Sequence, residues 1–254
     1  MRVLLVEDEE QLAGLAQREL EREYSHHVIV ASGLRDAEKH LGEQIFDVVV
    51  VDILYDPLVT EFDRRRRSQP LRPTDENLLA SGLSVITTTL DIKQTPGIVI
   101  WTSGDPTRRL HLIFAYEDLK VRAFCSKRSG SGSLAPLHQA IEAAGARRRY
   151  ADTILGVYLP GRESFALSAT LLREQAHRMF WRALALGYHT AEEIADVTPY
   201  AKKTVRNVMG DMLLELRRVD LGVGDTKKPQ PELVRYASSN RYFFLDDAVR
   251  KLYP

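Results

Sequence analysis

The sequence predicts an α/β unit with an open, doubly wound parallel sheet, followed by a smaller all-helical unit. Short apolar runs alternate with helical patterns as far as residue 146, which is typical of a parallel sheet with helices on both faces. From residue 165 onward, apolar residues recur at helical spacing alone. The length of 254 residues and the hydrophobic content of 44% allow one to two domains with cores of their own.

The first unit is predicted over residues 1–146. Its strands are short apolar runs, expected at 3–6, 28–31, 47–51, 98–101 and 123–126. Helices with one apolar face are expected at 10–23, 36–41, 76–90 and 134–144. The stretch 57–76 breaks this alternation, because it is polar and contains four consecutive arginines. We expect an inserted loop there, since long loops inside compact domains are usually functional or disordered.

The second unit is predicted over residues 165–238, after a linker at 147–164. Its apolar spacing predicts one helix that ends before Gly187, followed by a short helix at 191–197, a longer one that runs to about 219, and a last one at 231–238. The tail at 239–254 contains Tyr242, Phe243 and Phe244. Because this tail is too apolar to remain in free solution, we expect it to pack against the rest of the protein.

Composition narrows the possible functions. The net charge is zero, but residues 1–146 carry 17 Lys and Arg against 22 Asp and Glu, whereas residues 147–254 carry 18 against 13. The basic second half is the better candidate for contact with nucleic acid. The only cysteine, Cys125, excludes an internal disulfide framework and a cysteine-rich metal site. Since the sequence has neither an apolar run of about 18 residues nor a secretory signal segment, we expect a cytoplasmic protein without a membrane span.

Acidic residues follow two of the predicted strands. Asp52 closes the apolar run 48–51, and Glu7 and Asp8 follow the run 3–6. In an open parallel sheet, the carboxyl ends of neighbouring strands line one crevice, and ligands bind there. Three carboxylates that meet in this crevice repel one another unless a cation joins them, and Mg²⁺ takes oxygen ligands and holds phosphates beside them. The sequence therefore predicts a metal-assisted phosphoryl site.

Four short motifs extend this site along the chain. They are Val6-Glu7-Asp8-Glu9, Val50-Val51-Asp52-Ile53, Ile100-Trp101-Thr102-Ser103 and Cys125-Ser126-Lys127. They stand in order at the ends of the first, third, fourth and fifth predicted strands. In this arrangement they resemble the receiver domain of two-component response regulators, and the resemblance covers residues 1–145. It implies a flavodoxin-like fold with a five-stranded parallel sheet.

The resemblance also implies roles for individual residues. Asp52 would be the phospho-acceptor, because a carboxylate can attack phosphorus. Thr102 would donate a hydrogen bond to the phosphoryl group, and Lys127 would pair with one of its oxygens. Phe124 matches the position of a switch aromatic, although a phenylalanine in a strand is also ordinary core. Mg²⁺ would be held by Glu7, Asp8, Asp52 and the backbone carbonyl of Leu54.

A second resemblance lies in the helical half. Residues 187–195 and 203–207 resemble the helix-turn-helix of LuxR/NarL-type regulators, within a match over about residues 165–225. Thr190 and Glu193 form a capping-box pair that starts the first helix. Periodicity alone also allows a helical bundle whose exposed face happens to be basic. In the resemblance, the second helix enters the major groove with residues that suit phosphates and base edges: Lys202, Lys203, Thr204, Arg206 and Asn207.

Together, the two resemblances imply a response regulator that is not an enzyme. A sensor histidine kinase would phosphorylate Asp52, and the C-terminal unit would bind promoter DNA as a homodimer. Two alternatives remain open. The first is an atypical regulator that works without phosphorylation and is switched by a ligand or partner at the inserted loop. The second is an adaptor whose C-terminal helices bind a protein instead of DNA.

Overall fold

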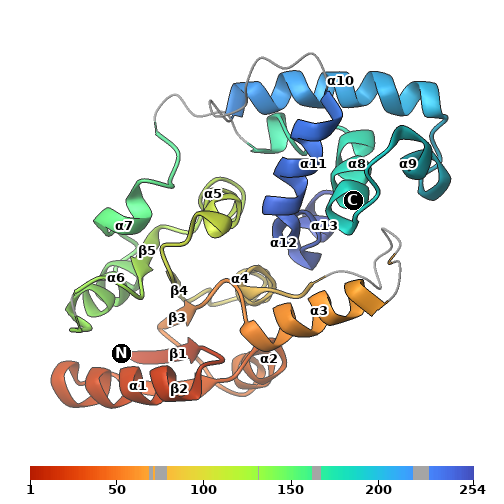
Figure 1. Ribbon diagram of the computed structural model, residues 1–254. Coiled ribbons are helices and arrows are strands. Elements are labelled where there is room, and N and C mark those ends of the chain that lie inside the picture. Colours follow the sequence, from red (N-terminus) through yellow and green to blue (C-terminus); the bar gives the residue numbers. More distant parts are fainter. Residues whose placement is uncertain (69–70, 72–78, 131, 162–166, 220–228) are drawn as a thin grey trace. The chain divides into compact units, whose positions relative to one another are not determined.

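The computed structural model describes residues 1–68, 71, 79–130, 132–161, 167–219 and 229–254 (Figure 1). The protein divides into two compact units. The first comprises Met1–Val59 and Ala80–Leu159, and the second comprises Thr60–Leu79 and Pro160–Pro254. The boundary expected at residue 146 therefore lies inside the first unit, and the segment that follows Val59 belongs with the C-terminal half.

The first unit is built on a parallel sheet with the strand order β2-β1-β3-β4-β5-β6. Figure 1 labels β1 to β5 of this sheet. The predicted strands are all present, but the prediction of five strands is wrong, because the described residues form six. The sixth has only two residues and lies in the predicted linker, where no apolar alternation marks it. The strands are β1 (Arg2–Val6), β2 (His27–Ala31), β3 (Val48–Val51), β4 (Gly97–Thr102), β5 (Ala123–Ser126) and β6 (Tyr150–Ala151).

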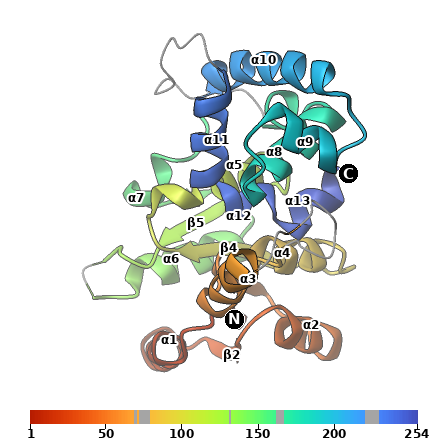
Figure 2. The same cartoon turned by 45° about the vertical axis from the view of Figure 1, so that its right-hand side comes forward.

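Helices cover both faces of this sheet. On one face lie α1 (Glu10–Tyr24) and α6 (Ala135–Gly145), and on the other lie α2 (Leu34–Glu43) and α4 (Gly82–Leu90) (Figure 2). Successive side chains of a strand point to opposite faces, so a continuous apolar run such as 48–51 suits a sheet that is covered twice. The unit also contains η2 (Pro106–Arg108), α5 (Arg109–Glu117) and α7 (Thr153–Gly156).

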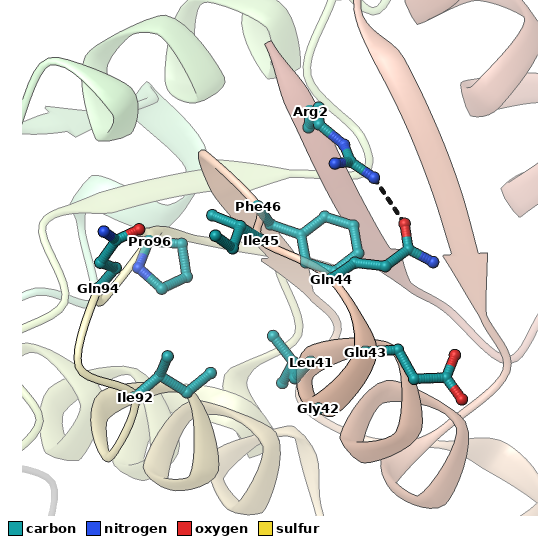
Figure 3. A pocket seen from close by; sticks show the side chains of 10 residues that line it. All are labelled: Arg2, Leu41, Gly42, Glu43, Gln44, Ile45, Phe46, Ile92, Gln94 and Pro96. Atoms are coloured by element: carbon teal, nitrogen blue, oxygen red, sulfur yellow. Dashed lines mark hydrogen bonds between the residues drawn. The ribbon is translucent and has the colours of Figure 1, made fainter.

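A pocket of about 410 Å³ lies at the amino-terminal edge of the sheet (Figure 3). Arg2 crosses part of its wall, where it donates a hydrogen bond to Gln44 at 2.6 Å. The acidic residues of interest follow the carboxyl ends of the strands, at the opposite edge, so this pocket is not part of their site. Its lining comprises Arg2, Leu41, Gly42, Glu43, Gln44, Ile45, Phe46, Ile92, Gln94 and Pro96.

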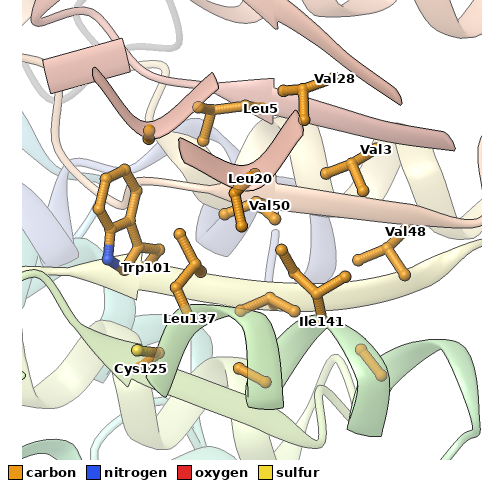
Figure 4. Packing of buried hydrophobic residues seen from close by; sticks show 14 of the residues in the cluster. Val3, Leu5, Leu20, Val28, Val48, Val50, Trp101, Cys125, Leu137 and Ile141 are labelled. Atoms are coloured by element: carbon orange, nitrogen blue, oxygen red, sulfur yellow. The ribbon is translucent and has the colours of Figure 1, made fainter. Parts of the chain in front are cut away.

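The sheet face towards α1 and α6 forms a continuous apolar core (Figure 4). Strand residues two apart face the same way, as do helix residues three or four apart, so alternate strand positions meet one stripe of each helix. This packing fixes the strands whose ends carry the acidic residues. Its buried members include Val3, Leu5, Val48, Val50 and Trp101 of the strands, Leu20 of α1, and Leu137 and Ile141 of α6.

The second unit is helical, as predicted. The apolar tail packs within this unit, which confirms another expectation: the rings of Trp181 and Phe244 stack with centroids 4.7 Å apart. Among the residues that the structure describes, none of the helices is both long and apolar enough to cross a membrane. After Pro160 the elements are η3 (Leu167–Ala169), α8 (Gln175–Leu186), α9 (Ala191–Val197), α10 (Lys202–Val219), α11 (Pro229–Ser239), α12 (Arg241–Phe244) and α13 (Asp247–Leu252).

The inserted stretch departs most from the prediction. A loop at 57–76 is wrong for its first part, which is helix α3 (Asp56–Ser68). Arginine and glutamate favour helix, and Glu61 pairs with Arg64 at 2.7 Å one turn along. The helix expected at 76–90 begins only at Gly82, where Ser81 caps it by accepting a hydrogen bond from Leu83 N–H at 3.0 Å. Residues 76–78 lie outside the described part.

Candidate phosphoryl site and nucleic-acid interface

The residues predicted to form a phosphoryl site lie together at the carboxyl edge of the sheet. Parallel pairing sets Val6 beside Val51 and Thr102 beside Ser126. The backbone N–H of Asp52 donates to Val6 O at 3.1 Å, and that of Lys127 donates to Thr102 O at 2.9 Å. These ladders continue one residue beyond the strands, and they bring together Glu7, Asp52, Thr102 and Lys127.

Asp52 is at the centre of this arrangement. Its exposed fraction is only 3%. Its Oδ1 accepts hydrogen bonds from the Thr102 hydroxyl at 2.5 Å and from the Ile53 N–H at 2.6 Å. Its Oδ2 lies 2.6 Å from the ammonium of Lys127. One oxygen is therefore held by two neutral donors while the other faces a cation, an arrangement that suits a carboxylate nucleophile for phosphorus.

Lys127 joins two buried carboxylates, because its ammonium also lies 2.6 Å from Glu7 Oε2. Burial raises the pKa of Glu7 to about 7, despite the opposing effect of Lys127. Burial lowers the pKa of Lys127, but Asp52 and Glu7 outweigh it, so this pKa is raised overall. The lysine thus remains charged, whereas burial makes ionisation of the Glu7 carboxyl group less favourable here than in water.

A divalent cation fits this set of donors. Carboxylate oxygens of Glu7, Asp8 and Asp52 lie within 4.8 Å of one another. Oxygen atoms of this kind are the ligands that Mg²⁺ takes in proteins. Three carboxylates also outnumber the single ammonium of Lys127, so additional positive charge is favoured here. Leu54 is 5% exposed and follows Asp52 by two residues, and its carbonyl stays a predicted ligand.

A second group of metal-binding side chain types occurs among the described residues, at His26, His138 and Glu142. His26 Nε2 lies 3.1 Å from His138 Nδ1, and the amino terminus lies 3.4 Å from His26 Nδ1. Both ring nitrogens of His26 therefore have a protein partner. Hydrogen bonding accounts for the two histidines, and we assign no ligand to this group.

The two residues expected to respond to phosphorylation are fully buried. Thr102 and Phe124 each have an exposed fraction of 0%. The Phe124 ring lies 6.2 Å from that of Tyr116, centroid to centroid. An inward Phe124 is compatible with a core residue and with the inward state of a switch, so its role as a switch stays a prediction.

Gly82 lies against the chain that follows β3, although sequence reasoning did not single it out. Its N–H donates to Ile53 O at 2.9 Å. A Cβ atom at Gly82 would lie only 1.8 Å from the backbone oxygen of Asp52. Only a residue without a side chain lets α4 begin this close to Asp52. The one signal for it in the sequence was the Ser-Gly pair before an apolar helix.

Asp152 supports the loop that carries Lys127, and it too was missed. Its Oδ2 accepts hydrogen bonds from the Ser126 N–H and the Ser129 hydroxyl, on either side of the lysine. Its Oδ1 accepts from the N–H groups of the first turn of α7, at 3.0 and 2.7 Å. An aspartate before a short helical pattern is an N-cap signal, but its reach back to β5 depends on the fold.

The predicted DNA-binding residues lie on one exposed surface at the start of α10. The preceding helix α9 begins with the predicted capping box, in which Thr190 Oγ1 accepts from Glu193 N–H at 3.1 Å and Glu193 Oε2 accepts from Thr190 N–H at 2.8 Å. The opposite side of α10 is buried through Val205 and Met209. The exposed residues in its first two turns are Lys202, Lys203, Thr204, Arg206 and Asn207.

Glu192 of α9 pairs with two of these basic residues. It forms ion pairs with Lys202 and, at 3.2 Å, with Arg206. All three side chains are about half exposed or more, so such pairs stabilise the fold little. They do reduce the positive charge that α10 presents. Sequence reasoning missed Glu192, because its partners lie in the next helix.

Solved structures of response regulators share this fold. The structure of the two-component response regulator RcsB in complex with DNA has 16% identity and a TM-score of 0.53, over 94% of this chain and 98% of that chain. A structure of two RcsB dimers bound to two parallel DNAs has 18% identity and a TM-score of 0.53, over 94% and 98%. RcsB of Salmonella typhimurium has 16% identity and a TM-score of 0.52, over 94% and 99%.

These likenesses extend along almost the whole chain, and they show its fold. The protein has the same order of parts as these structures, an α/β unit with a parallel sheet followed by a helical unit. No protein-family model matches the chain, and a search of curated proteins finds no match either.

Proposed function

We propose that this protein is a response regulator in which phosphorylation of Asp52 controls binding of promoter DNA by the helix-turn-helix. The observation that carries the proposal is the environment of Asp52. This buried carboxylate lies within hydrogen-bond distance of Thr102 and Lys127 and beside two further acids. Each of these residue types has a task in phosphoryl transfer, which depends on positioning and on neutralising charge.

The chemistry assigned to these residues is a simple displacement. Asp52 Oδ2 forms the new bond to phosphorus while the bond to the donor breaks, and the electron pair of that bond leaves with the donor group, such as the imidazole of a sensor histidine kinase. Mg²⁺ held by Glu7, Asp8, Asp52 and the Leu54 carbonyl would neutralise the charge on the phosphoryl oxygens. Lys127 pairs with one phosphoryl oxygen, and Thr102 turns its hydroxyl from Asp52 to another. The protein acts as the substrate of the kinase and is not itself an enzyme.

The output side of the proposal rests on α9 and α10. Their capping box, the buried inner face of α10 and its exposed basic residues fit a recognition helix that enters the major groove. RcsB, which shares the fold, has been solved with DNA and as dimers on DNA. By analogy, we assign promoter DNA as the partner of this chain and a homodimer as the bound form.

Acetyl phosphate with Mg²⁺ tests the acceptor, and intact mass reads the result. One phosphoryl adduct is expected on the wild-type chain and none on Asp52→Asn, which keeps the shape of the side chain but removes the nucleophilic charge. A gel shift with and without acetyl phosphate tests the output. An adduct that persists in Asp52→Asn would place the chemistry elsewhere and refute the assignment.

One observation favours a second candidate, a regulator that works without phosphorylation. Lys127 bridges Glu7 and Asp52, two of the carboxylates that would hold Mg²⁺. If this bridge excludes the metal, the wild-type chain forms no adduct under any condition yet still binds DNA. An adaptor that binds a protein would instead form the adduct but show no specific DNA affinity. Lys203→Ala and Arg206→Ala would then leave the gel shift unchanged from that of the wild type.

A further inference from the structure

The segment that follows the acceptor strand is part of the C-terminal unit. β3 ends one residue before Asp52, and α3 begins four residues after it. From Thr60 to Leu79 the chain belongs to the second unit, and it rejoins the first at Ala80. A longer surface loop of a receiver would be expected to contact only its own unit. This segment instead contacts residues more than 160 positions further along the chain.

The helical part of this segment is held by a charged cluster. Asp63 Oδ2 accepts hydrogen bonds from Arg241 Nη2 at 2.7 Å and from the Tyr242 hydroxyl at 3.0 Å. The side chains of Asp63 and Arg241 are only 16% and 26% exposed. The guanidinium carbon also lies 4.7 Å from the ring centroid of Tyr242. A partly buried carboxylate with two donors is a specific contact, unlike the exposed pair of Glu61 and Arg64 on the same helix.

The far end of the segment is held by its backbone. The Leu79 N–H donates to Leu245 O at 2.7 Å, and the Asp247 N–H donates to Leu79 O at 3.0 Å. Leu79 thus makes a parallel bridge with Asp246, and its side chain is 4% exposed. Both ends of the segment therefore attach to one short stretch of the tail, residues 241–247.

We infer that residues 241–247 form a binding site for the inserted segment of this same chain, and that this contact couples Asp52 to the DNA-binding helices. The ligand of the site is a helix that presents a carboxylate, followed by an extended residue that adds one backbone bridge. The coupling part of the inference rests on the proposed function. The binding part concerns the structure alone.

A continuous set of contacts leads from this site to the recognition helix. α12, which contains Arg241 and Tyr242, packs against α8 and α11, and both of these pack against α10. Phe244 stacks on Trp181 of α8 within this path. At the other end, the Gly82 N–H ties the returning chain to Ile53, the residue next to the acceptor. The segment is therefore attached beside Asp52 at Gly82 and to residues 241–247 at Asp63 and Leu79. A rearrangement at Asp52 would change the contacts that the segment makes with residues 241–247.

The test compares Asp63→Ala, Arg241→Ala and the double variant with Glu61→Ala in the full-length chain. Glu61→Ala removes the same charge from the same helix, but its partner, Arg64, is local. Tyr242→Phe removes only the hydroxyl and guards against a variant that does not fold. Amide hydrogen exchange at Leu79 and Asp247 reads the binding site, intact mass after acetyl phosphate reads the acceptor, and fluorescence anisotropy reads DNA affinity.

Asp63→Ala and Arg241→Ala are each expected to speed exchange at Leu79 and Asp247 by about tenfold, the factor that loss of a charge-assisted hydrogen bond implies. The double variant should show little further change, and Glu61→Ala none. The adduct should still form, but DNA affinity should no longer respond to it. If Leu79 and Asp247 exchange at the same rate in Asp63→Ala as in Glu61→Ala, residues 241–247 are not a binding site for the inserted segment.

The coupling is overturned separately, if exchange speeds up in Asp63→Ala while the response of DNA affinity to phosphorylation stays as in the wild type. Failure of the proposed function looks different from both results. In that case the wild-type chain itself shows no adduct or no DNA binding, while the exchange pattern of the variants still reports on residues 241–247.

Discussion

The ammonium of Lys127 lies 2.6 Å from Oδ2 of Asp52, in an ion pair of which 16% and 4% of the side-chain surfaces remain exposed. The same ammonium lies 2.6 Å from Glu7. Because Glu7 and Asp52 are also the proposed ligands of Mg²⁺, the lysine and the metal share two carboxylates. The balance between these two cations is a property that can be measured.

Replacing Lys127 with alanine should leave Glu7 and Asp52 buried without their cation. Loss of one partner of a buried pair typically costs about 3–5 kcal/mol, so we expect a loss of this order in the free energy of unfolding without metal. Mg²⁺ should then stabilise Lys127→Ala more than the wild type, because it no longer competes with the ammonium. Urea unfolding with and without Mg²⁺ measures both effects. The exposed Lys39→Ala is the control, and equal stabilisation of wild type and Lys127→Ala by Mg²⁺ would contradict the shared-ligand model.

Gly82→Ala should disturb the backbone at Asp52. The added Cβ would meet the backbone oxygen of Asp52 at 1.8 Å and a methyl group of Val51 at 2.8 Å. Overpacking of this kind costs about 1–3 kcal/mol, and we expect slower formation of the phosphoryl adduct as well. Gly42→Ala is a matched control inside α2, where a Cβ meets nothing within 4 Å. That control should stabilise the protein by up to about 1 kcal/mol, through helix propensity. Thermal unfolding measures the change in stability, and the rate of adduct formation measures the effect on Asp52. Equal results for the two variants would refute the close approach of Gly82 to the backbone oxygen of Asp52.

The clustering of the acidic residues at one edge of the sheet could be predicted from the sequence, because it depends on short-range rules. Apolar runs identify strands, parallel strands share one carboxyl edge, and the residue after each run is therefore placed at that edge. This rule places Asp52 and Glu7, whereas Lys127 was predicted only from the resemblance to receiver domains. Their exact hydrogen bonds did not follow, since these depend on rotamers that packing decides.

The inserted segment could not be predicted in this way. Its polar composition fits a loop and an exposed helix equally well, and the structure has α3. The contact between Asp63 and Arg241 joins residues 178 positions apart, and no local pattern records it. Gly82 was missed for the same reason, because the atom that forbids a side chain there belongs to Asp52.

Acid should weaken the C-terminal unit through His177 of α8. Burial lowers the pKa of His177, against the carboxylates of Glu174, Asp211 and Glu215, while Arg173 lowers it further. Because the pKa in the folded state lies below that in the unfolded state, the unfolded chain binds more protons. Stability should therefore be full above the unfolded value of about 6.5 and fall as the pH decreases below it, by about 1.4 kcal/mol for each unit of pKa difference.

His177→Gln should flatten this pH dependence in thermal unfolding between pH 7 and pH 5. His189→Gln is the control, because His189 is exposed. If the wild type and His177→Gln lose stability in parallel as the pH falls, another group is responsible for the acid sensitivity.

Glu192 should lower the affinity of the protein for DNA. It pairs with Lys202 and Arg206, so two of the cations that α10 offers to phosphates are already engaged. Glu192→Gln keeps the size of the side chain, removes its charge and releases both cations. We expect tighter binding to DNA of any sequence, because phosphate contacts dominate affinity and carry no sequence information.

The salt dependence of binding distinguishes the release of Lys202 and Arg206 from the mere loss of one negative charge. Each additional phosphate contact steepens the slope of log K against log salt by about 0.9, so Glu192→Gln should steepen it by roughly one to two. Asp196→Asn removes the same charge from an exposed position one turn along α9, and there it should leave the slope nearly unchanged. Anisotropy titrations over a range of salt concentrations give both slopes. Equal slopes for Glu192→Gln and the wild type would mean that Lys202 and Arg206 reach DNA despite their ion pairs, or do not reach it at all. Lys202→Ala separates these two cases, because only a cation that contacts phosphate lowers the slope when it is removed.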